Sequence, residues 1–369
     1  MRRILSLVLV FICLTTTVFG AECYVVMDAL SGRVLYSKNE NIKRGMASTT
    51  KIMTTVTALE NADADREVVV SASASGVEGS SMYLKAGERL KLKDLLYGVM
   101  LVSGNDAATA TAEAVGGSEE KFVEMMNEKA EEMGLKDTHF DNPHGLSSDN
   151  HYTTAFELGQ IMRYALLSPD FREISSQKSK TVTTSEGEKY LKNHNKLLST
   201  CDGCFSGKTG FTKKDGRCLV SACNRENMEL ICVTLYDPDD WNTHSTLYNT
   251  AFAEYEGVKF VEGGTYLSEI KVKKGEKQTV PVLAEKDIII PLKEGESTEF
   301  ELICDIPEKI IAPMKKGDVA GEFYINTNYG KFGPFKAVLG EDAIRRKVTG
   351  GTFLDSLERF FSVWIKTFA

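Results

Sequence analysis

The sequence predicts an α+β protein: an antiparallel sheet flanked by helices, with a helical subdomain, followed by a small all-β sandwich and a terminal amphipathic helix. Three observations support this class. Strand patterns at residues 22–40 and 216–236 enclose a stretch of helical patterns. From residue 271 to 339, short alternating runs separated by Gly, Pro and Lys-Gly turns replace helical periodicity. Residues 350–369 have apolar and charged side chains on opposite sides of a helix.

The elements of the first region follow from local patterns. Two strands around a Ser-Gly turn open it, and a hairpin around Asn-Arg-Glu-Asn closes it. Ser118 is a typical helix cap and Gly134 a typical helix stop. Between the strands we expect a helix at 48–60, a turn and an amphipathic helix at 82–102, a loop and a buried alanine-rich helix at 103–117, and a further helix at 118–134.

The first twenty residues are typical of a secretory signal peptide. Two arginines precede an apolar run at 4–14, and Val18 and Gly20 are small residues suited to cleavage. The run is short for a membrane span, so an uncleaved anchor is the less favoured alternative. Cys13 follows Ile12, which does not fit a lipoprotein site. We therefore expect an exported protein divided into a signal peptide at 1–20, a catalytic domain at 21–257, an all-β domain at 264–343 and an anchor helix at 350–369.

Composition narrows the class of protein further. The chain of 369 residues is 42% hydrophobic and 26% charged, which suits a soluble protein with two domains. Its net charge is −8 and its body has no long basic block, which argues against nucleic-acid binding. Without Cys13, seven cysteines remain, so at least one thiol is unpaired. Cys201 and Cys204 are expected to be a local disulfide or two plain thiols, because no further metal ligands match their spacing.

The tail predicts contact with a membrane surface. Three basic residues at 345–347 precede it. Such a basic, aromatic amphipathic segment suits an interfacial anchor better than the alternative, a helix packed on the core. Its apolar side comprises Phe353, Leu357, Phe360, Phe361, Trp364 and Phe368, and its polar side Asp355, Glu358, Arg359, Ser362 and Lys366.

The chemistry is expected to start at Ser48 and Lys51. A spacing of three puts both side chains on one face of a helix, about 5–6 Å apart at Cβ. A lysine held in a dry pocket can be neutral and can take the proton of a serine hydroxyl. The amide of Ser48, at the helix N-terminus, is suited to stabilise an oxyanion. Alone, this pair is a weak signal, and a capping serine with a solvent-exposed lysine would usually be the better explanation.

Two later motifs supply the other walls of a cleft. Ser103 is suited to relay a proton between Lys51 and a leaving group, and Asn105 to bind a substrate amide. In the Lys-Thr-Gly tripeptide, Lys208 supplies positive charge and Thr209 a hydroxyl for a substrate carboxylate. Gly210 leaves room for substrate along the strand edge, and the N–H of Phe211 is the expected second oxyanion donor.

Together the three motifs resemble the signature of penicillin-recognising serine acyl enzymes, which share a penicillin-binding/β-lactamase-like transpeptidase domain. Within that group the chain is most similar to the low-molecular-mass D-alanyl-D-alanine carboxypeptidases, and the similarity extends over nearly all of the mature chain. The matching text is "STTK", "SGN" in place of Ser-Asp-Asn, "GLKDTHFDNPHGL", "HNKLL" and "GKTGFT".

The resemblance implies a reaction without metal or organic cofactor. Ser48 attacks the penultimate D-alanine of a peptidoglycan stem peptide, with Lys51 as base, and water hydrolyses the acyl-enzyme. β-Lactams, which mimic the terminal dipeptide, are expected to acylate Ser48. The tail is expected to hold the enzyme on the outer face of the cytoplasmic membrane. Many relatives have His where this chain has Phe211. For the substrate carboxylate, Arg217 is one candidate arginine; the alternatives are that Arg217 is a surface residue at a strand start and that Lys208 and Thr209 suffice.

Three alternative interpretations are less well supported. His139, His144 and His151 invite a metal site, but a structured loop with hydrogen-bonded histidines fits their spacing better. A β-lactamase needs a deacylating glutamate, and no motif supplies one. A catalytically idle wall-binding scaffold fits poorly with three intact motifs. Stem-peptide preference, a vegetative or sporulation role, disulfide connectivity, oligomeric state and the partner of the β domain are not determined by the sequence.

Overall fold

The computed structural model describes residues 20–346 and divides the chain into two compact units between Glu256 and Gly257. The signal peptide predicted at 1–20, apart from Gly20, and the anchor helix predicted at 350–369 lie outside the described residues. None of the helices within 20–346 is long and apolar enough to cross a membrane. The seven cysteines that the structure describes are free thiols, of which only Cys304 is exposed.

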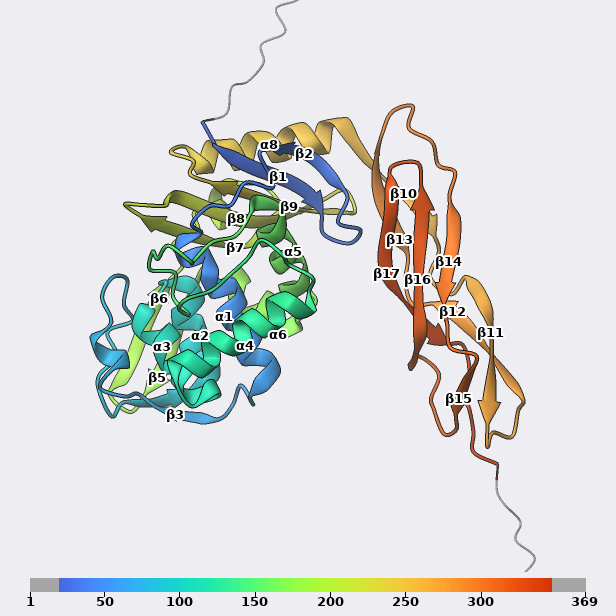
Figure 1. The fold of residues 1–369 in the computed structure, drawn as a ribbon, viewed down its shortest axis with the longest axis horizontal. Helices are drawn as coiled ribbons and strands as arrows, with labels where there is room; N and C mark the ends of the chain where they lie inside the picture. Colours follow the sequence, from blue (N-terminus) through green and yellow to red (C-terminus); the bar gives the residue numbers. More distant parts are fainter. Residues whose placement is uncertain (1–19, 347–369) are drawn as a thin grey trace, which may run out of the picture. The chain divides into compact units, whose positions relative to one another are not determined.

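The first unit is built around one antiparallel sheet with the strand order β2-β1-β9-β8-β7 (Figure 1). Two strands come from the start of the unit and three from its end, as the sequence patterns predict. β7 is an edge strand, so alternate backbone groups along its outer side are free of ladder hydrogen bonds. The strands are β1 (Cys23–Asp28), β2 (Val34–Lys38), β7 (Cys204–Thr212), β8 (Gly216–Arg225) and β9 (Met228–Leu235).

Helices cover both faces of this sheet. α8 (Asp240–Glu254) contacts β8 and β9, and α5 (Ala155–Ala165) contacts β1, β8 and β9 from the other side (Figure 1). Alternation along β9 explains how one strand serves two cores. Ile231 and Val233 join the core shared with α5, whereas Leu230 and Cys232 join the core shared with α8. A sheet buried on both faces is a rigid support for a site at its edge.

The helical subdomain comes between β2 and β7 in the chain. The helices within 48–60, 82–102, 103–117 and 118–134 lie where the sequence predicts them, whereas Ala155–Ala165 and Pro169–Ser176 were not predicted. Leu92–Leu101 is buried on almost all sides rather than amphipathic, because other helices surround it. Two small two-stranded sheets were also missed, since their strands are short and mostly polar. The elements are η1 (Ala47–Thr50), α1 (Lys51–Asn61), β3 (Glu67–Val69), η2 (Ala74–Gly76), β4 (Arg89–Lys91), α2 (Leu92–Leu101), α3 (Asn105–Gly116), α4 (Glu119–Glu132), α6 (Pro169–Ser176), β5 (Ser179–Thr184), β6 (Gly187–Lys192) and α7 (Leu197–Thr200).

The second unit is all-β over its described residues. It has a six-stranded sheet in the order β14-β16-β17-β12-β11-β15 and a two-stranded sheet of β10 and β13. Its core includes Ile270, Val282, Phe323 and Ile325, whose relative exposure is 0%. The strands are β10 (Tyr255–Val261), β11 (Tyr266–Lys273), β12 (Thr279–Ala284), β13 (Ile288–Lys293), β14 (Glu301–Asp305), β15 (Lys309–Ile311), β16 (Val319–Thr327) and β17 (Gly330–Leu339).

Candidate active site

Ser48 lies in the short 3₁₀ turn η1, directly ahead of α1. The residue before it, Ala47, has a positive φ of 46°, a conformation that costs free energy in a non-glycine residue. Two glycines pack against this stretch of backbone. A Cβ atom on Gly145 would lie 2.0 Å from the Ala47 oxygen, and a Cβ on Gly210 would lie 2.9 Å from the Ser48 nitrogen. The turn is therefore held between a loop and strand β7.

The role expected for Gly210 needs correction. The sequence suggested that its missing side chain makes room for substrate along the strand. In the structure Gly210 is buried, and the space that a side chain would fill is taken by atoms of residues 46–48. The glycine thus lets β7 approach the amide of Ser48 closely, which no other residue type would allow.

Lys51 is fully buried one turn beyond Ser48. Its Nζ lies 3.1 Å from Ser48 Oγ, 2.7 Å from Asn105 Oδ1 and 2.6 Å from the His144 carbonyl oxygen. The carbonyl and amide oxygens can only accept hydrogen bonds. A neutral amine would use its two hydrogens on them and direct its lone pair toward the serine hydroxyl. The three contacts therefore fit a lysine that acts as a base.

Burial also favours the neutral form of this lysine. Desolvation lowers the pKa of Lys51 well below its usual value, and the charge of Lys208 lowers it further, against an opposing effect of Asp106. The three distances alone would suit an ammonium donor equally well. Burial, rather than the partner atoms, therefore favours the neutral amine.

Lys208 and Ser103 form the second pair of the site. Lys208, on β7, is buried, and its Nζ donates to Ser103 Oγ at 3.0 Å and to the Thr209 carbonyl oxygen at 2.8 Å. Desolvation lowers the pKa of Lys208 to about 7. Ser103 has a positive φ of 59°, at the sharp turn between α2 and α3. The positive charge of Lys208 is one of the causes that lower the pKa of Lys51, because two ammonium groups in one site repel each other.

Asn105 does not have a free amide in this structure. Its Oδ1 accepts from Lys51, and its Nδ2 donates to the Glu78 carbonyl oxygen at 2.6 Å. The second bond fixes which end of the amide faces the lysine. The neighbouring carboxylate of Asp106 anchors the 80–84 loop by accepting from Met82 N, Leu84 N and Ser81 Oγ. Asn105 is therefore placed to orient Lys51, whereas the sequence suggested a contact with substrate.

The side chains of Thr209 and Phe211 lie on a different face of β7 from Lys208 and Gly210. Side chains alternate between the faces of a strand, so these two leave β7 on the side opposite to Lys208 and Gly210. Phe211 is 65% exposed. The backbone groups of Thr209 and Phe211, rather than their side chains, flank Gly210 and so lie near the Ser48 amide. This placement fits the N–H of Phe211 as an oxyanion donor, and leaves the carboxylate contact of Thr209 as a prediction.

Sequence reasoning missed the part of the loop at 139–151 that supports the site. The carbonyl oxygen of His144 accepts from Lys51 and lies 3.3 Å from Ser48 Oγ. His151 Nδ1 accepts from Asp141 N, which leaves Nε2 as the donor to Thr50 Oγ1 at 2.7 Å. Thr50 in turn donates to the Ala47 oxygen at 2.7 Å. This chain of hydrogen bonds from His151 through Thr50 supports the strained residue ahead of the nucleophile.

The histidines of this loop have protein partners. Burial lowers the pKa of His144 to about 3 and that of His151 to about 4, so both are neutral near pH 7. His139 Nδ1 contacts the Asn150 oxygen at 2.8 Å. Within residues 20–346 no cluster of His, Cys, Asp or Glu is arranged to hold a metal ion. Hydrogen bonds within a structured loop, not a ligand spacing, explain the motif.

Arg217 is engaged elsewhere. Its Nη2 lies 2.7 Å from Asp240 Oδ1, and its guanidinium is 5.4 Å from the Trp241 ring centre. Asp240 is almost fully buried, so loss of the pair would leave a buried carboxylate without its partner. Arg217 therefore has a structural partner on α8 that competes with any substrate carboxylate.

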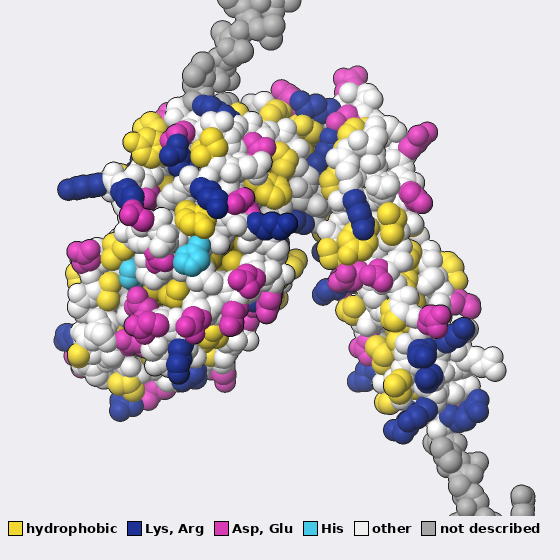
Figure 2. Space-filling view, in the orientation of Figure 1, with side chains coloured by type: hydrophobic (Ala, Val, Ile, Leu, Met, Phe, Trp, Pro, Cys, Tyr) yellow, Lys and Arg dark blue, Asp and Glu magenta, His cyan; other side chains and the backbone are white. Residues whose placement is uncertain are grey.

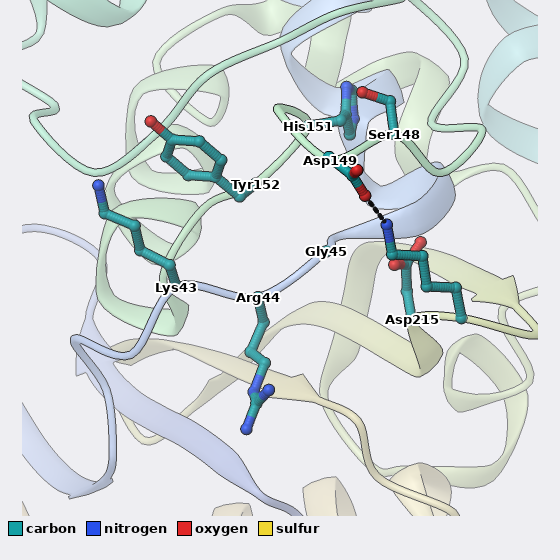
Figure 3. A pocket seen from close by; sticks show the side chains of 9 residues that line it. Lys43, Arg44, Gly45, Ser148, Asp149, His151, Tyr152 and Asp215 are labelled. Atoms are coloured by element: carbon teal, nitrogen blue, oxygen red, sulfur yellow. Dashed lines mark hydrogen bonds and ion pairs between the residues drawn. The ribbon is translucent and has the colours of Figure 1, made fainter.

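A pocket of about 330 Å³ lies between the segment 43–45, which precedes η1, and residues of the loops at 148–152 and 214–215 (Figure 3). Lys214 and Asp149 form an ion pair across it at 2.5 Å, while Lys43 extends toward the Tyr152 ring, 4.6 Å from its centre. The side chain of Arg44 points away. None of the eight predicted site residues lines it; the lining is Lys43, Arg44, Gly45, Ser148, Asp149, His151, Tyr152, Lys214 and Asp215.

Comparison with known proteins gives consistent matches to both units. A family model described as D-alanyl-D-alanine carboxypeptidase matches residues 15–239, and the penicillin-binding protein 5 C-terminal domain matches residues 255–343. The chain is 30% identical over 358 residues to D-alanyl-D-alanine carboxypeptidase DacF of Bacillus subtilis, covering 94% of this chain and 90% of the relative. It is 33% identical over 323 residues to DacA of Haemophilus influenzae, covering 82% and 80%.

A solved structure shares the arrangement of the elements. The structure of penicillin binding protein 5 from Haemophilus influenzae matches with a TM-score of 0.68 at 30% identity, over 90% of this chain and 99% of that one. The predicted α+β class, with a transpeptidase domain followed by a β domain, is thereby confirmed.

Burial of Lys208 gives a testable pH dependence of stability. Its pKa is about 7 in the folded protein, against an ordinary lysine value of 10.5, so the unfolded chain binds more protons between these values. Wild-type stability should therefore rise relative to Lys208→Met as the pH increases from 7 to 10.5, by at most about 1.4 kcal/mol per pH unit. In the variant, the charge of Lys208 no longer lowers the pKa of Lys51, so the stability of the variant depends less on pH and the difference from wild type grows in the same direction.

Urea unfolding of both proteins across this range measures the difference. Lys196→Met, at an exposed lysine, is the control and should show no such slope. A difference between wild type and Lys208→Met that stays constant over the range would contradict the buried, titrating lysine.

Proposed function

The chain belongs to the D-alanyl-D-alanine carboxypeptidase family, and from this premise we propose that Ser48 is the residue on which the acyl-enzyme forms. The activity is that of a serine-type D-Ala-D-Ala carboxypeptidase, which removes the terminal D-alanine from peptidoglycan stem peptides. Covalent binding of penicillin is characteristic of the family. The observation that carries the assignment to Ser48 is the buried Lys51 Nζ, 3.1 Å from its hydroxyl.

In the acylation step, Ser48 Oγ attacks the carbonyl carbon of the penultimate D-alanine. Its proton passes to the neutral Lys51 Nζ, whose hydrogens remain bonded to Asn105 Oδ1 and the His144 oxygen. Negative charge develops on the carbonyl oxygen of the substrate. The N–H groups of Ser48 and Phe211, on the two backbones that Gly210 brings together, stabilise that charge.

The leaving D-alanine needs a proton on its nitrogen. We assign this transfer to Ser103, which relays the proton taken up by Lys51. Because Lys208 donates to Ser103 Oγ, the hydroxyl hydrogen of Ser103 is available for the leaving nitrogen. In the second half of the reaction, water attacks the ester carbonyl, Lys51 accepts the water proton, and the Ser48 hydroxyl is regenerated.

The terminal carboxylate of the substrate is assigned to Lys208 and Thr209. A pKa of about 7 leaves Lys208 partly charged near neutral pH, and an arriving carboxylate favours its protonated form. β-Lactams present a carboxylate and a reactive carbonyl in a similar relation and are expected to acylate Ser48 by the same first step.

We place this reaction outside the cytoplasm. The support is the pattern of a secretory signal at residues 1–20 and the peptidoglycan substrate of the family. The amphipathic segment at 350–369 would hold the enzyme at the outer face of the cytoplasmic membrane, because its aromatic side suits the interface between headgroups and acyl chains.

Ser48→Ala tests the assignment directly. Purified wild-type protein should release D-alanine from a peptide ending in D-Ala-D-Ala and should be labelled by a fluorescent penicillin, with the label on the peptide containing Ser48. The variant should lose both signals, by about 10⁴-fold or more, because no other group can form the acyl ester. D-Alanine release by Ser48→Ala at the wild-type rate would refute the assignment. Rapid turnover of penicillin by the wild type would instead favour a β-lactamase.

The hydrogen bonds from His151 through Thr50 predict a second effect. Thr50→Val keeps the shape of the side chain but removes the hydroxyl that supports Ala47. We expect kcat/KM and the rate of penicillin acylation to fall about tenfold to a hundredfold, because a small displacement of the nucleophile suffices for that loss. Thr50→Ser should restore most of the activity.

Thr57→Val on the same helix is the matched control. The Thr57 hydroxyl is buried and has no hydrogen-bond partner among the described atoms. Its removal should leave the acylation rate unchanged and stability unchanged or higher. Equal loss of activity in Thr50→Val and Thr57→Val would show a general packing effect rather than a positioning role.

Deletion of residues 350–369 tests the anchor. In high salt, where electrostatic attraction to lipid is screened, the shortened protein should move from the membrane fraction to the soluble fraction, since the aromatic face is lost, while penicillin acylation continues at the wild-type rate. A shortened protein that stays with membranes in high salt contradicts the assignment of the anchor to this segment.

A further inference from the structure

One end of the second unit carries a cationic surface, here called the basic tip, formed by residues 273–277, 311–316 and 344–346. Three backbone contacts bring these segments together. Lys273 pairs with Ile311 where β11 and β15 run parallel, and Gly275 forms a bridge with Arg345. The nitrogen of Arg346 donates to the Lys274 oxygen at 2.8 Å. The tip is thus a fixed part of the fold, although its segments are distant in sequence.

The positive charge of the tip is mostly free of acidic partners. Among the described residues, one tip lysine, Lys277, has an ion pair, with Glu341. The nearby carboxylates of Asp318 and Asp342 accept from backbone N–H groups of Lys315 and Lys316, and Glu276 is also exposed. Six cations of the tip are exposed and have no acidic partner among residues 20–346: Lys273, Lys274, Lys315, Lys316, Arg345 and Arg346.

This surface contrasts with the rest of the chain. The whole protein has a net charge of −8, yet Lys and Arg outnumber Asp and Glu at this end. Figure 2 shows dark blue side chains gathered at the end of the unit where the described chain stops. Concentrated charge of this sign attracts anionic surfaces, and the attraction falls off within a Debye length.

Two apolar side chains stand among these cations. Ile311 is 62% exposed and Ile344 is 55% exposed. Exposed isoleucines within a ring of lysines and arginines are typical of surfaces that enter the interface of a bilayer, where the apolar groups reach the acyl chains and the charges meet phosphates. A soluble anionic polymer would use the charges but would have no use for the isoleucines.

We propose that the basic tip docks directly on the surface of an anionic phospholipid bilayer, through its lysines, its arginines, Ile311 and Ile344. The inference rests on the extracytoplasmic location proposed above. It adds a contact made by the folded β unit to the one assigned to residues 350–369, which follow Arg346 in sequence and would reach the same surface. Two contacts together would fix the unit on the membrane, whereas a single amphipathic segment would act only as a tether.

Vesicle binding of the mature full-length chain tests this. The test variant carries Lys273→Gln, Lys274→Gln, Lys315→Gln and Lys316→Gln. The matched control carries Lys259→Gln, Lys286→Gln, Lys331→Gln and Lys336→Gln, four exposed lysines of the same unit away from the tip, with the same change in net charge. Binding is measured by cosedimentation with vesicles of phosphatidylglycerol and phosphatidylcholine, and with phosphatidylcholine alone.

On the anionic vesicles we expect the test variant to bind at least about tenfold more weakly than the control, because each basic residue near a charged bilayer strengthens binding severalfold. On neutral vesicles the two should bind alike. Ile311→Ser with Ile344→Ser should weaken binding to anionic vesicles without changing its salt dependence. Fluorescent-penicillin acylation of all variants should stay at the wild-type rate, which separates this inference from the assignment of the catalytic residues.

Equal binding of the test and control variants to anionic vesicles would overturn the proposal, because it would assign all membrane affinity to other parts of the chain. If the test variant then lost binding to an anionic wall polymer such as a poly(glycerol phosphate), the tip would be a polymer site instead.

Discussion

The burial of Lys51 is the constraint around which the catalytic unit is arranged. A lysine without water around it favours the neutral form, and only a neutral amine can accept the proton of Ser48. Burial has to be compensated by hydrogen bonds, and the partners come from three segments: Ser48 on the adjacent turn and, far away in sequence, Asn105 at the start of α3 and the carbonyl of His144 in the loop at 139–151. These partners also fix the direction of the lone pair.

The same constraint explains why the supporting elements are so rigid. Asn105 is held by Glu78, and Asp106 fastens the 80–84 loop with several hydrogen bonds. On the other side, β7 belongs to a sheet buried on both faces, and Gly210 lets that strand meet the backbone of Ser48. A base and an oxyanion donor located on separate elements keep their geometry only when each element is itself fixed. The strained φ of Ala47 is maintained by this surrounding structure.

The second unit is expected to serve the enzyme through its surface rather than through catalytic residues. It contributes none of the predicted catalytic residues, and its core is formed by alternating strand residues such as Phe323 and Ile325. Its distinctive features lie on its surface, where cationic and apolar side chains gather at one end. An enzyme whose substrate is part of the wall beside a membrane gains from a defined position relative to both, and a β unit can provide that position without taking part in the chemistry.

The sequence by itself determined the residue types of the site and most of the fold. Order and spacing of Ser48, Lys51, Ser103 and the Lys-Thr-Gly tripeptide identified the family, because each residue type is required by the chemistry and its position in the chain is characteristic of the family. Helix caps such as Ser118 and the alternation along β8 and β9 placed the main elements, since these signals are local. The helices at 155–165 and 169–176 were not predicted, and neither were the strands of the two small sheets, which are short and mostly polar, so that local patterns did not mark them.

Only the tertiary structure decided how these residues act on one another. The contacts of Lys51 with His144 and of His151 with Thr50 join positions about a hundred residues apart, and the partner atom on His144 is a backbone oxygen, which every residue type has. The closeness of Gly210 to Ser48 depends on the packing of an edge strand against a turn, which no sequence pattern records. Long-range contacts between backbone atoms leave no signature in residue type, and for that reason the site's supporting geometry had to come from the fold.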